Sequence, residues 1–138
     1  MKNLIYLRVI TPKKIVFDDE VYSVTAPSST GEITVLPRHT NLFSLLVEGI
    51  VKIRTKDQLN YLAIGSGYLE TNGKEINLLV SRAYGQSEID EQITQRAIEQ
   101  AKKTLQEAKS EQQRYEASTL LRKSLIDLKL LRHHRHAP

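Results

Sequence analysis

The sequence predicts an all-β amino-terminal domain followed by a carboxy-terminal antiparallel pair of helices. In the first part of the chain, short segments rich in β-branched residues alternate with turn-forming residues. From Ser87 onward there is no Gly or Pro until Pro138. Apolar residues in that second part recur at spacings of three and four, which is the period of an amphipathic helix. We therefore expect a β domain over residues 1–85 and a helical hairpin over residues 86–138.

Composition restricts the classes of function. The 138 residues are 40% hydrophobic and 26% charged, as in a globular chain of one domain or one small domain with an appendage. There is no cysteine, which excludes disulfides and thiolate chemistry. We find neither a signal-peptide core nor an apolar run long enough to span a membrane. The net charge of +4 is spread over both halves and aromatic residues are few, which disfavours a nucleic-acid-binding protein that uses its basic tail.

Alternation of apolar and polar residues predicts the strands of the β domain. We expect strands over residues 4–10, 15–17, 21–26, 33–36, 42–47, 50–55, 61–64, 68–71 and 75–80. The predicted connections include an acidic turn at 18–20, a turn cluster at 27–31 and a type I′ hairpin turn at Asn72-Gly73. Gly65-Ser66-Gly67 indicates a bulge or tight bend, and nothing after it supports a phosphate-binding loop. Many short strands with regular turns predict a β-sandwich or flattened barrel.

The segment from Gly31 to Leu42 is unusually well specified for a connection. Pro37 removes a backbone donor and should end the preceding strand. The residues after it form a polar tip between two apolar segments: Arg38, His39, Thr40 and Asn41. This tip is either a plain connection or a contact surface. Since the chain offers no catalytic group for it to serve, we favour the contact surface.

Two helices are expected in the second part. Ser87 with Asp90, and Ser110 with Gln113, have the spacing of capping boxes. The first apolar stripe comprises Ile89, Ile93, Ala97, Ala101, Leu105 and Ala108, and the second comprises Ala117, Leu120, Leu121, Leu125, Leu128 and Leu131. A hairpin with so many alanines should cost only a modest free energy to open. The basic residues near its end either complement the helix dipole or dock on an acidic partner.

Nothing in the sequence indicates catalysis. His133, His134 and His136 lie together at the chain end with no carboxylate beside them to complete a metal site. His39 has no Ser or Cys motif around it, and the carboxylates are scattered. We expect no enzyme, no cofactor and no metal.

Three segments together resemble the epsilon subunits of F-type ATP synthases. They are the segment from Thr25 to His39, with the pattern Gly-Glu-x-x-x-Leu-Pro-x-His, the segment Gly65-Ser66-Gly67-Tyr68-Leu69-Glu70, and the helical pair that begins Glu88-Ile89-Asp90-Glu91. The resemblance covers nearly the whole chain. It implies a ten-stranded β-sandwich plus a helical hairpin, in a non-catalytic subunit of the rotating central stalk.

The resemblance also implies partners and a location. The expected partners are the gamma subunit, the ring of c subunits and, in an inhibitory state, the alpha/beta catalytic head. Glu32, Arg38 and His39 would face the c ring, whereas Arg122, Lys123 and Lys129 would meet the catalytic beta subunits when the hairpin extends and inhibits ATP hydrolysis. The subunit would be peripheral, on the cytoplasmic face of a bacterial inner membrane or the stromal face of a thylakoid.

The sequence departs from the family at three places. Thr34 replaces a common glycine and Asn41 a common proline, so the loop should have a somewhat different shape. Some bacterial members bind ATP through Ile/Leu-Asp-x-x-Arg-Ala. Ile89 and Asp90 match that motif, but Ile93 and Thr94 occupy the Arg-Ala places and supply no phosphate-pairing guanidinium. We expect weak or no ATP binding. The alternative to a stalk subunit is a stand-alone β-sandwich ligand-binding module whose helices dimerise.

Overall fold

A computed structural model describes residues 3–38 and 41–136, with side chains as far as His133. The chain forms two compact units, residues 1–84 and 85–138. The first contains the strands β1 (Ile5–Ile10), β2 (Ile15–Val21), β3 (Ser23–Ser28), β4 (Gly31–Val35), β5 (Leu42–Leu46), β6 (Gly49–Arg54), β7 (Leu59–Ile64), β8 (Gly67–Thr71), β9 (Glu75–Val80) and β10 (Ala83–Tyr84). The second contains a 3₁₀ turn, η1 (Gln86–Glu88), and the helices α1 (Glu91–Glu107) and α2 (Glu111–His136).

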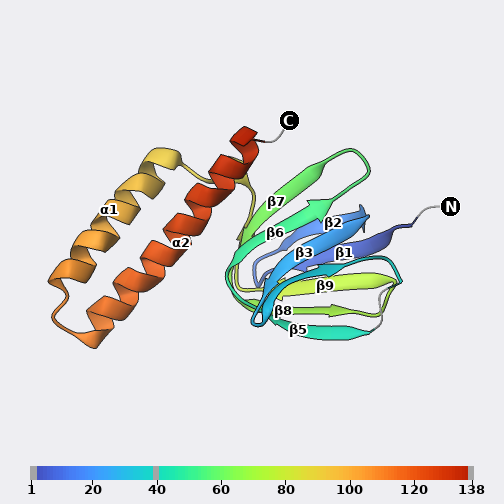
Figure 1. The fold of residues 1–138 in the computed structure, drawn as a ribbon, viewed down its shortest axis with the longest axis horizontal. Coiled ribbons are helices and arrows are strands. Elements are labelled where there is room, and N and C mark those ends of the chain that lie inside the picture. The colour runs from blue at the N-terminus through green and yellow to red at the C-terminus, as the bar shows by residue number, and fades with distance from the viewer. Residues whose placement is uncertain (1–2, 39–40, 137–138) are drawn as a thin grey trace. The chain divides into compact units, whose positions relative to one another are not determined.

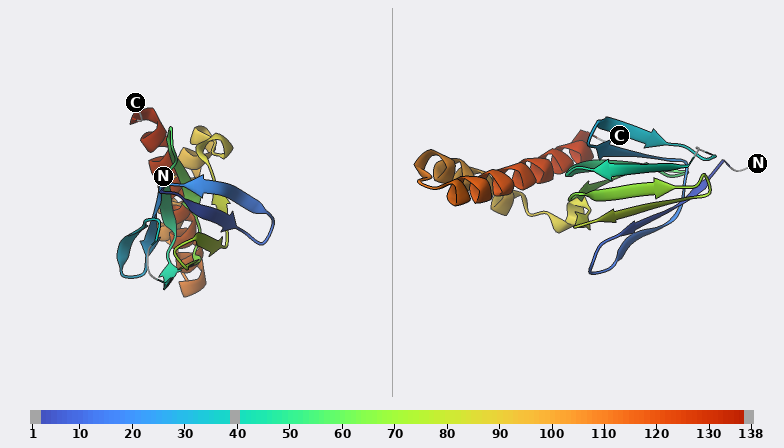
Figure 2. Two further views of the ribbon diagram at one scale, coloured as in Figure 1. Left: turned by 90° about the vertical axis from the view of Figure 1, so that its right-hand side faces the viewer. Right: turned by 90° about the horizontal axis from the view of Figure 1, so that it is seen from below.

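The ten strands form a β-sandwich, as predicted (Figure 1). They are linked in the order β10-β7-β6-β3-β5-β8-β9-β1-β2, and β4 pairs with β3 outside that path. All pairs are antiparallel except β1 with β9. The further views in Figure 2 show how strongly the strands twist, with the β1–β2 and β3–β4 hairpins diverging from the rest.

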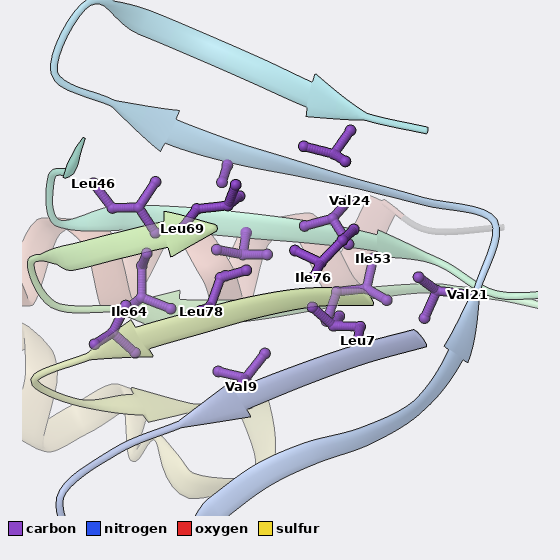
Figure 3. Close-up of a cluster of buried hydrophobic side chains, with 14 of the residues drawn as sticks. Leu7, Val9, Val21, Val24, Leu46, Ile53, Ile64, Leu69, Ile76 and Leu78 are labelled. Carbon is purple, nitrogen blue, oxygen red and sulfur yellow. The ribbon is translucent and has the colours of Figure 1, made fainter. Parts of the chain in front are cut away.

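The core lies between the two layers of strands. Inward-facing aliphatic side chains such as Leu7, Ile53, Leu69 and Leu78 are fully buried and interdigitate (Figure 3). Each comes from a strand in which residues two apart point to the same side, so one face of every such strand supplies the core. The apolar positions that alternate in the sequence therefore place this core correctly.

In the first half of the sandwich, one predicted turn is absent and another is shorter than predicted. Asp18, Asp19 and Glu20 do not form a turn but continue β2. Their carboxylates are accommodated because β2 is an edge strand with an exposed face, on which Arg8 pairs with Asp18. The turn cluster at 27–31 is also shorter than predicted, because β3 runs to Ser28 and only Ser29 and Thr30 turn the chain.

The hairpin between β8 and β9 is not the predicted type I′ turn. Thr71 stands opposite Ile76, which leaves four residues between the paired positions rather than two. Gly73 has a positive φ of 90°, but Asn72 does not. Asn72 instead closes the turn with its side chain, since its Oδ1 accepts hydrogen bonds from the backbone N–H groups of Lys74 and Glu75, both at 2.9 Å.

The bend at Gly65-Ser66-Gly67 is present, and close packing against backbone atoms requires glycine at position 67, whereas side chains crowd position 65. A Cβ atom on Gly67 would lie 1.9 Å from the carbonyl oxygen of Leu79, and one on Gly65 would lie 2.0 Å from Ser81 Oγ. Neither glycine has a positive φ. The bend therefore depends on the absence of a side chain rather than on an unusual backbone conformation.

Helix α1 begins later than expected, whereas α2 begins at the expected residue. Ser87 lies in η1, and Asp90 caps α1 by accepting a hydrogen bond from the Ile93 N–H at 2.9 Å. Ser110 caps α2 through the Gln113 N–H at 3.1 Å, as predicted. The Gln113 side chain bonds the N–H of Lys109, one residue before the cap, at 2.9 Å. Both α1 and α2 thus start on a side-chain oxygen.

The predicted apolar stripes are only partly buried. On α1 the buried residues are Thr94, Ile98 and Ala101, whereas Ile93 is 62% exposed. On α2 the buried residues among those described are Ala117, Ser124, Asp127, Leu130 and Leu131. Leu120 and Leu125, which the prediction placed in the stripe, are 40% and 45% exposed. The periodicity was correct, but the buried face of each helix is rotated relative to the prediction.

Candidate partner-binding surfaces

The polar tip after β4 is one candidate contact surface. Glu32, Thr34 and Leu36 form an exposed row along β4 and its end, because alternate residues of a strand share a face. Within the described part of the chain β4 pairs only with β3, so its outer edge is open. Pro37 follows this row, and β4 runs from Gly31 to Val35, so it starts two residues before the predicted strand over 33–36 and ends one residue before its predicted end.

Arg38 is held in a defined conformation at the end of this row. Its φ is +66°, a left-handed conformation that is uncommon outside glycine, and its side chain is exposed. Its N–H donates to the Gly73 carbonyl at 3.1 Å, which ties the tip to the β8–β9 turn. Glu32 lies near the start of β4 and Arg38 lies three residues beyond its end, so the strand stands between these two predicted ring-contact residues. His39 lies outside the described residues.

A second candidate surface crosses the outside of the sheet and was not predicted. The strand register places one residue from each of five adjacent strands in line, each opposite the next: Leu45, Tyr68, Leu79, Ile10 and Ile15. We call these five residues the outer apolar row. None of the five is fully buried, and Leu45 and Ile15 are 59% and 54% exposed. Strands about 4.8 Å apart make this row about 19 Å long.

A phenylalanine enlarges the outer apolar row at its β5 end. Phe43 is 61% exposed and its ring stacks on that of Tyr68, with ring centroids 5.1 Å apart. Val47, just beyond β5, is 41% exposed. A contiguous patch of this kind on a small protein is typical of a site where another protein binds. The signal in the sequence was the run Leu42 to Val47, which has apolar residues at both odd and even positions although the strand buries one face.

A polar row runs beside the outer apolar row on the same face. Glu70, Asn77, Arg8 and Asp18 stand opposite one another on four consecutive strands. The Arg8 guanidinium pairs with Asp18 at 3.8 Å and with Glu75 at 3.5 Å, and it lies 4.9 Å from the centre of the Tyr6 ring. The Tyr6 hydroxyl donates to Asp18, and this hydrogen bond to a carboxylate raises the pKa of Tyr6. Apolar and charged rows thus lie side by side on this face.

The helical unit carries the predicted basic residues on two different sides of α2. Arg122 and Lys129 are exposed and seven residues apart, so they share a face with Tyr115, which is 67% exposed. Lys123 points elsewhere, because its Nζ pairs with Asp127 Oδ2 at 3.2 Å. The structure therefore groups Arg122 with Lys129 and separates Lys123 from them.

The partial nucleotide-binding motif at the start of α1 has a structural role. Asp90 caps the helix, as described above, and Ile93 points outward. A shallow hollow at this helix start is lined by Ile89, Asp90, Glu91, Gln92 and Gln95, which include two carboxylates and no cation. Such a lining disfavours a phosphate group. No cluster of three metal-ligating side chains occurs among the described residues.

No helix in the described part of the chain is long and apolar enough to cross a membrane.

Comparison with known proteins identifies relatives over most of the chain. Residues 4–86 match the model of the family "ATP synthase, Delta/Epsilon chain, beta-sandwich domain". The chloroplastic ATP synthase epsilon chain of Citrus sinensis is 36% identical over 118 residues, which cover 86% of this chain and 89% of that protein. The corresponding chain of Nicotiana tabacum is 34% identical over the same shares.

Two solved structures have a similar fold. A chain in the Euglena gracilis mitochondrial ATP synthase structure, which contains OSCP, F1 and the c-ring, superposes with a TM-score of 0.80 at 20% identity, over 99% of this chain and 84% of that one. A chain in the central stalk and c-ring structure of the Tetrahymena thermophila enzyme superposes with a TM-score of 0.59 at 12% identity, over 92% and 96%. At these identities the likeness concerns the fold.

Proposed function

Since the chain belongs to the family of ATP synthase delta/epsilon chains, we propose that it works as a non-catalytic central-stalk subunit. In this role it joins the gamma subunit to the ring of c subunits and helps couple ring rotation to ATP synthesis performed by the catalytic head. It associates with the membrane peripherally, through the complex. The observation that carries the proposal is the outer apolar row, an exposed apolar face that suits a protein partner, on a domain that belongs to this family.

We propose that the gamma subunit covers the outer apolar row. Leu45, Ile15 and the stacked pair Phe43–Tyr68 present side chains that lose contact with water when a partner binds. The polar row beside it, centred on Arg8, can orient that partner through its charges. Glu32, Arg38 and His39 remain our proposed contacts with the c ring, along β4 and at its tip.

The helical hairpin is the proposed regulatory part. When it extends from the sandwich, the exposed cations Arg122 and Lys129 can meet acidic segments of the catalytic beta subunits and inhibit ATP hydrolysis. Lys123 is a weaker candidate for this contact, because Asp127 already neutralises it. The partial nucleotide motif lacks a cation, so we propose that ATP does not control this movement.

Co-purification tests the stalk assignment. The tagged full-length chain should retain the gamma subunit, and membranes carrying the complex should retain both. A chain that elutes alone as a soluble dimer, with no affinity for gamma, would instead support a stand-alone ligand-binding module. The variant Leu45→Asp serves as the matched control, because it should fold and yet lose gamma.

A further inference from the structure

Arg38, which lies just beyond β4, has a backbone conformation that its residue type disfavours. Its φ of +66° lies in the left-handed region, where the Cβ atom of an L-residue crowds the backbone. A residue free to choose would occupy that region for only about one part in five to one part in thirty of the time. The hydrogen bond from the Arg38 N–H to the Gly73 carbonyl oxygen, at 3.1 Å, opposes this preference.

The side chain of Asn72 orients the carbonyl that accepts this bond. The Gly73 carbonyl belongs to the same peptide unit as the N–H of Lys74. Because a peptide unit is planar and trans, a contact that fixes its N–H also fixes the direction of its carbonyl on the opposite side. The Lys74 N–H donates to Oδ1 of Asn72 at 2.9 Å. One line of hydrogen bonds therefore runs from Asn72 through this peptide unit to Arg38.

Further hydrogen bonds keep the β8–β9 turn from rotating around Gly73. Oδ1 of Asn72 also accepts from the Glu75 N–H at 2.9 Å. On the other side, the Gly73 N–H donates to Oγ1 of Thr71 at 3.2 Å. Thr71 is 7% exposed, and its hydroxyl donates to the Glu75 carbonyl at 2.8 Å. Gly73 itself has a φ of +90°, which glycine adopts readily, so both peptide units that flank it are held by side chains.

We propose that Asn72 is a positioning residue for the contact of Arg38 with the c ring. It acts through the Gly73–Lys74 peptide unit, which its side chain aims at the Arg38 N–H. Hydrogen bonds in such a line polarise one another, so loss of the first weakens the last. This inference rests on the proposed ring contact of Arg38, and it assigns the shape of that contact to a residue of a different hairpin.

Amide hydrogen exchange in the isotope-labelled full-length chain tests the geometry without any partner. Asn72→Ala removes the accepting oxygen, so exchange of the Arg38 N–H should become at least about fivefold faster. Asn72→Asp retains an oxygen that accepts both N–H groups and should preserve slow exchange. The matched control is Gln58→Ala, which removes an exposed side-chain amide from the β6–β7 turn without a change of charge. An unchanged rate in Asn72→Ala, or an equal increase in Gln58→Ala, would overturn the inference.

A binding titration tests the functional role. The full-length chain, in complex with the gamma subunit, is titrated with detergent-solubilised c ring. Apparent affinity falls in proportion to the fraction of molecules in the binding conformation, so Asn72→Ala should weaken ring binding by up to about five- to thirtyfold. In the Arg38→Ala background the same substitution should cause no further loss, because Asn72 acts only through Arg38. An equal loss in both backgrounds, which a general weakening of the domain would produce, would overturn the inference.

The single variant Arg38→Ala separates this inference from the proposed function. If Arg38→Ala weakens ring binding but Asn72→Ala does not, the positioning role is refuted while the ring contact stands. If Arg38→Ala leaves the affinity unchanged, the proposed ring contact fails, and the role of Asn72 in binding fails with it. The exchange rates of the chain alone then still decide whether Asn72 fixes the conformation of Arg38.

Discussion

The substitution Leu45→Asp tests whether the gamma subunit binds the outer apolar row. Leu45 is 59% exposed on β5 and stands opposite Tyr68, so the isolated domain has little to lose from the change. A fully buried leucine contributes about 1.5–3 kcal/mol, so covering the exposed three-fifths of this side chain is worth roughly 1–2 kcal/mol to binding. Leu45→Ala should therefore weaken binding of the gamma subunit by about five- to thirtyfold.

The aspartate should do more than remove this contact. An unpaired carboxylate buried under a partner costs several kcal/mol, so we expect the affinity of Leu45→Asp for gamma to fall by at least about a hundredfold. The assay is a binding titration with purified gamma subunit, followed by fluorescence anisotropy, with circular dichroism to verify the fold. Leu59→Asp is the control, because Leu59 is an exposed leucine of β7 that lies off the outer apolar row. Equal affinities for wild type and Leu45→Asp, or an equal loss in Leu59→Asp, would refute the assignment of this face.

Three further predictions concern other parts of the chain. Gly67→Ala should lower the free energy of unfolding of the β domain by about 3 kcal/mol or more, because its Cβ would lie 1.9 Å from a backbone oxygen. Gly31→Ala should lower it by only about 1 kcal/mol, because Gly31 has a φ of +121° but open space around it. Chemical denaturation measures both changes. Isothermal titration should detect no micromolar ATP binding to the wild-type chain, because the hollow at the start of α1 has two carboxylates and no cation in its lining; a strong heat of binding would contradict this inference. Ultraviolet titration should show Tyr6 losing its proton above pH 10, with Asp18→Asn lowering that midpoint. Because the pKa of Tyr6 is raised on folding, its contribution to stability is present below pH 10 and is lost as the pH rises through the higher folded value.

The sequence was sufficient to predict most of the β domain. Alternation in segments such as Ile50 to Thr55 fixes both the strand and its buried side, because one face of each strand must cover the core. The cap at Ser110 was predicted correctly and the end of β4 just before Pro37 to within one residue, because both follow from local chemistry. Where a tertiary contact overrides local preference, prediction fails. Asp18 remains in a strand because β2 pairs with β1 along this stretch, a tertiary contact that the local sequence does not encode.

The proposed binding surface was harder to predict than the fold. Leu45, Tyr68 and Ile15 are far apart in the sequence, and only the strand register brings them into one row. The helix stripes failed for a related reason. Ile93 and Ile98 both fit an amphipathic pattern, and the choice of which one is buried depends on how α2 packs against α1. Periodicity gives the spacing of a face but not its rotation.

The rate of ATP hydrolysis by the reconstituted complex tests the central claim most directly. The complex is assembled with the full-length chain or with a chain that ends at Gly85, and the rates are compared at equal subunit occupancy. A stalk subunit whose hairpin inhibits the head predicts that both chains assemble and that the truncated one gives faster hydrolysis. Equal rates from fully assembled complexes, or a failure of either chain to assemble with the gamma subunit, would contradict the account.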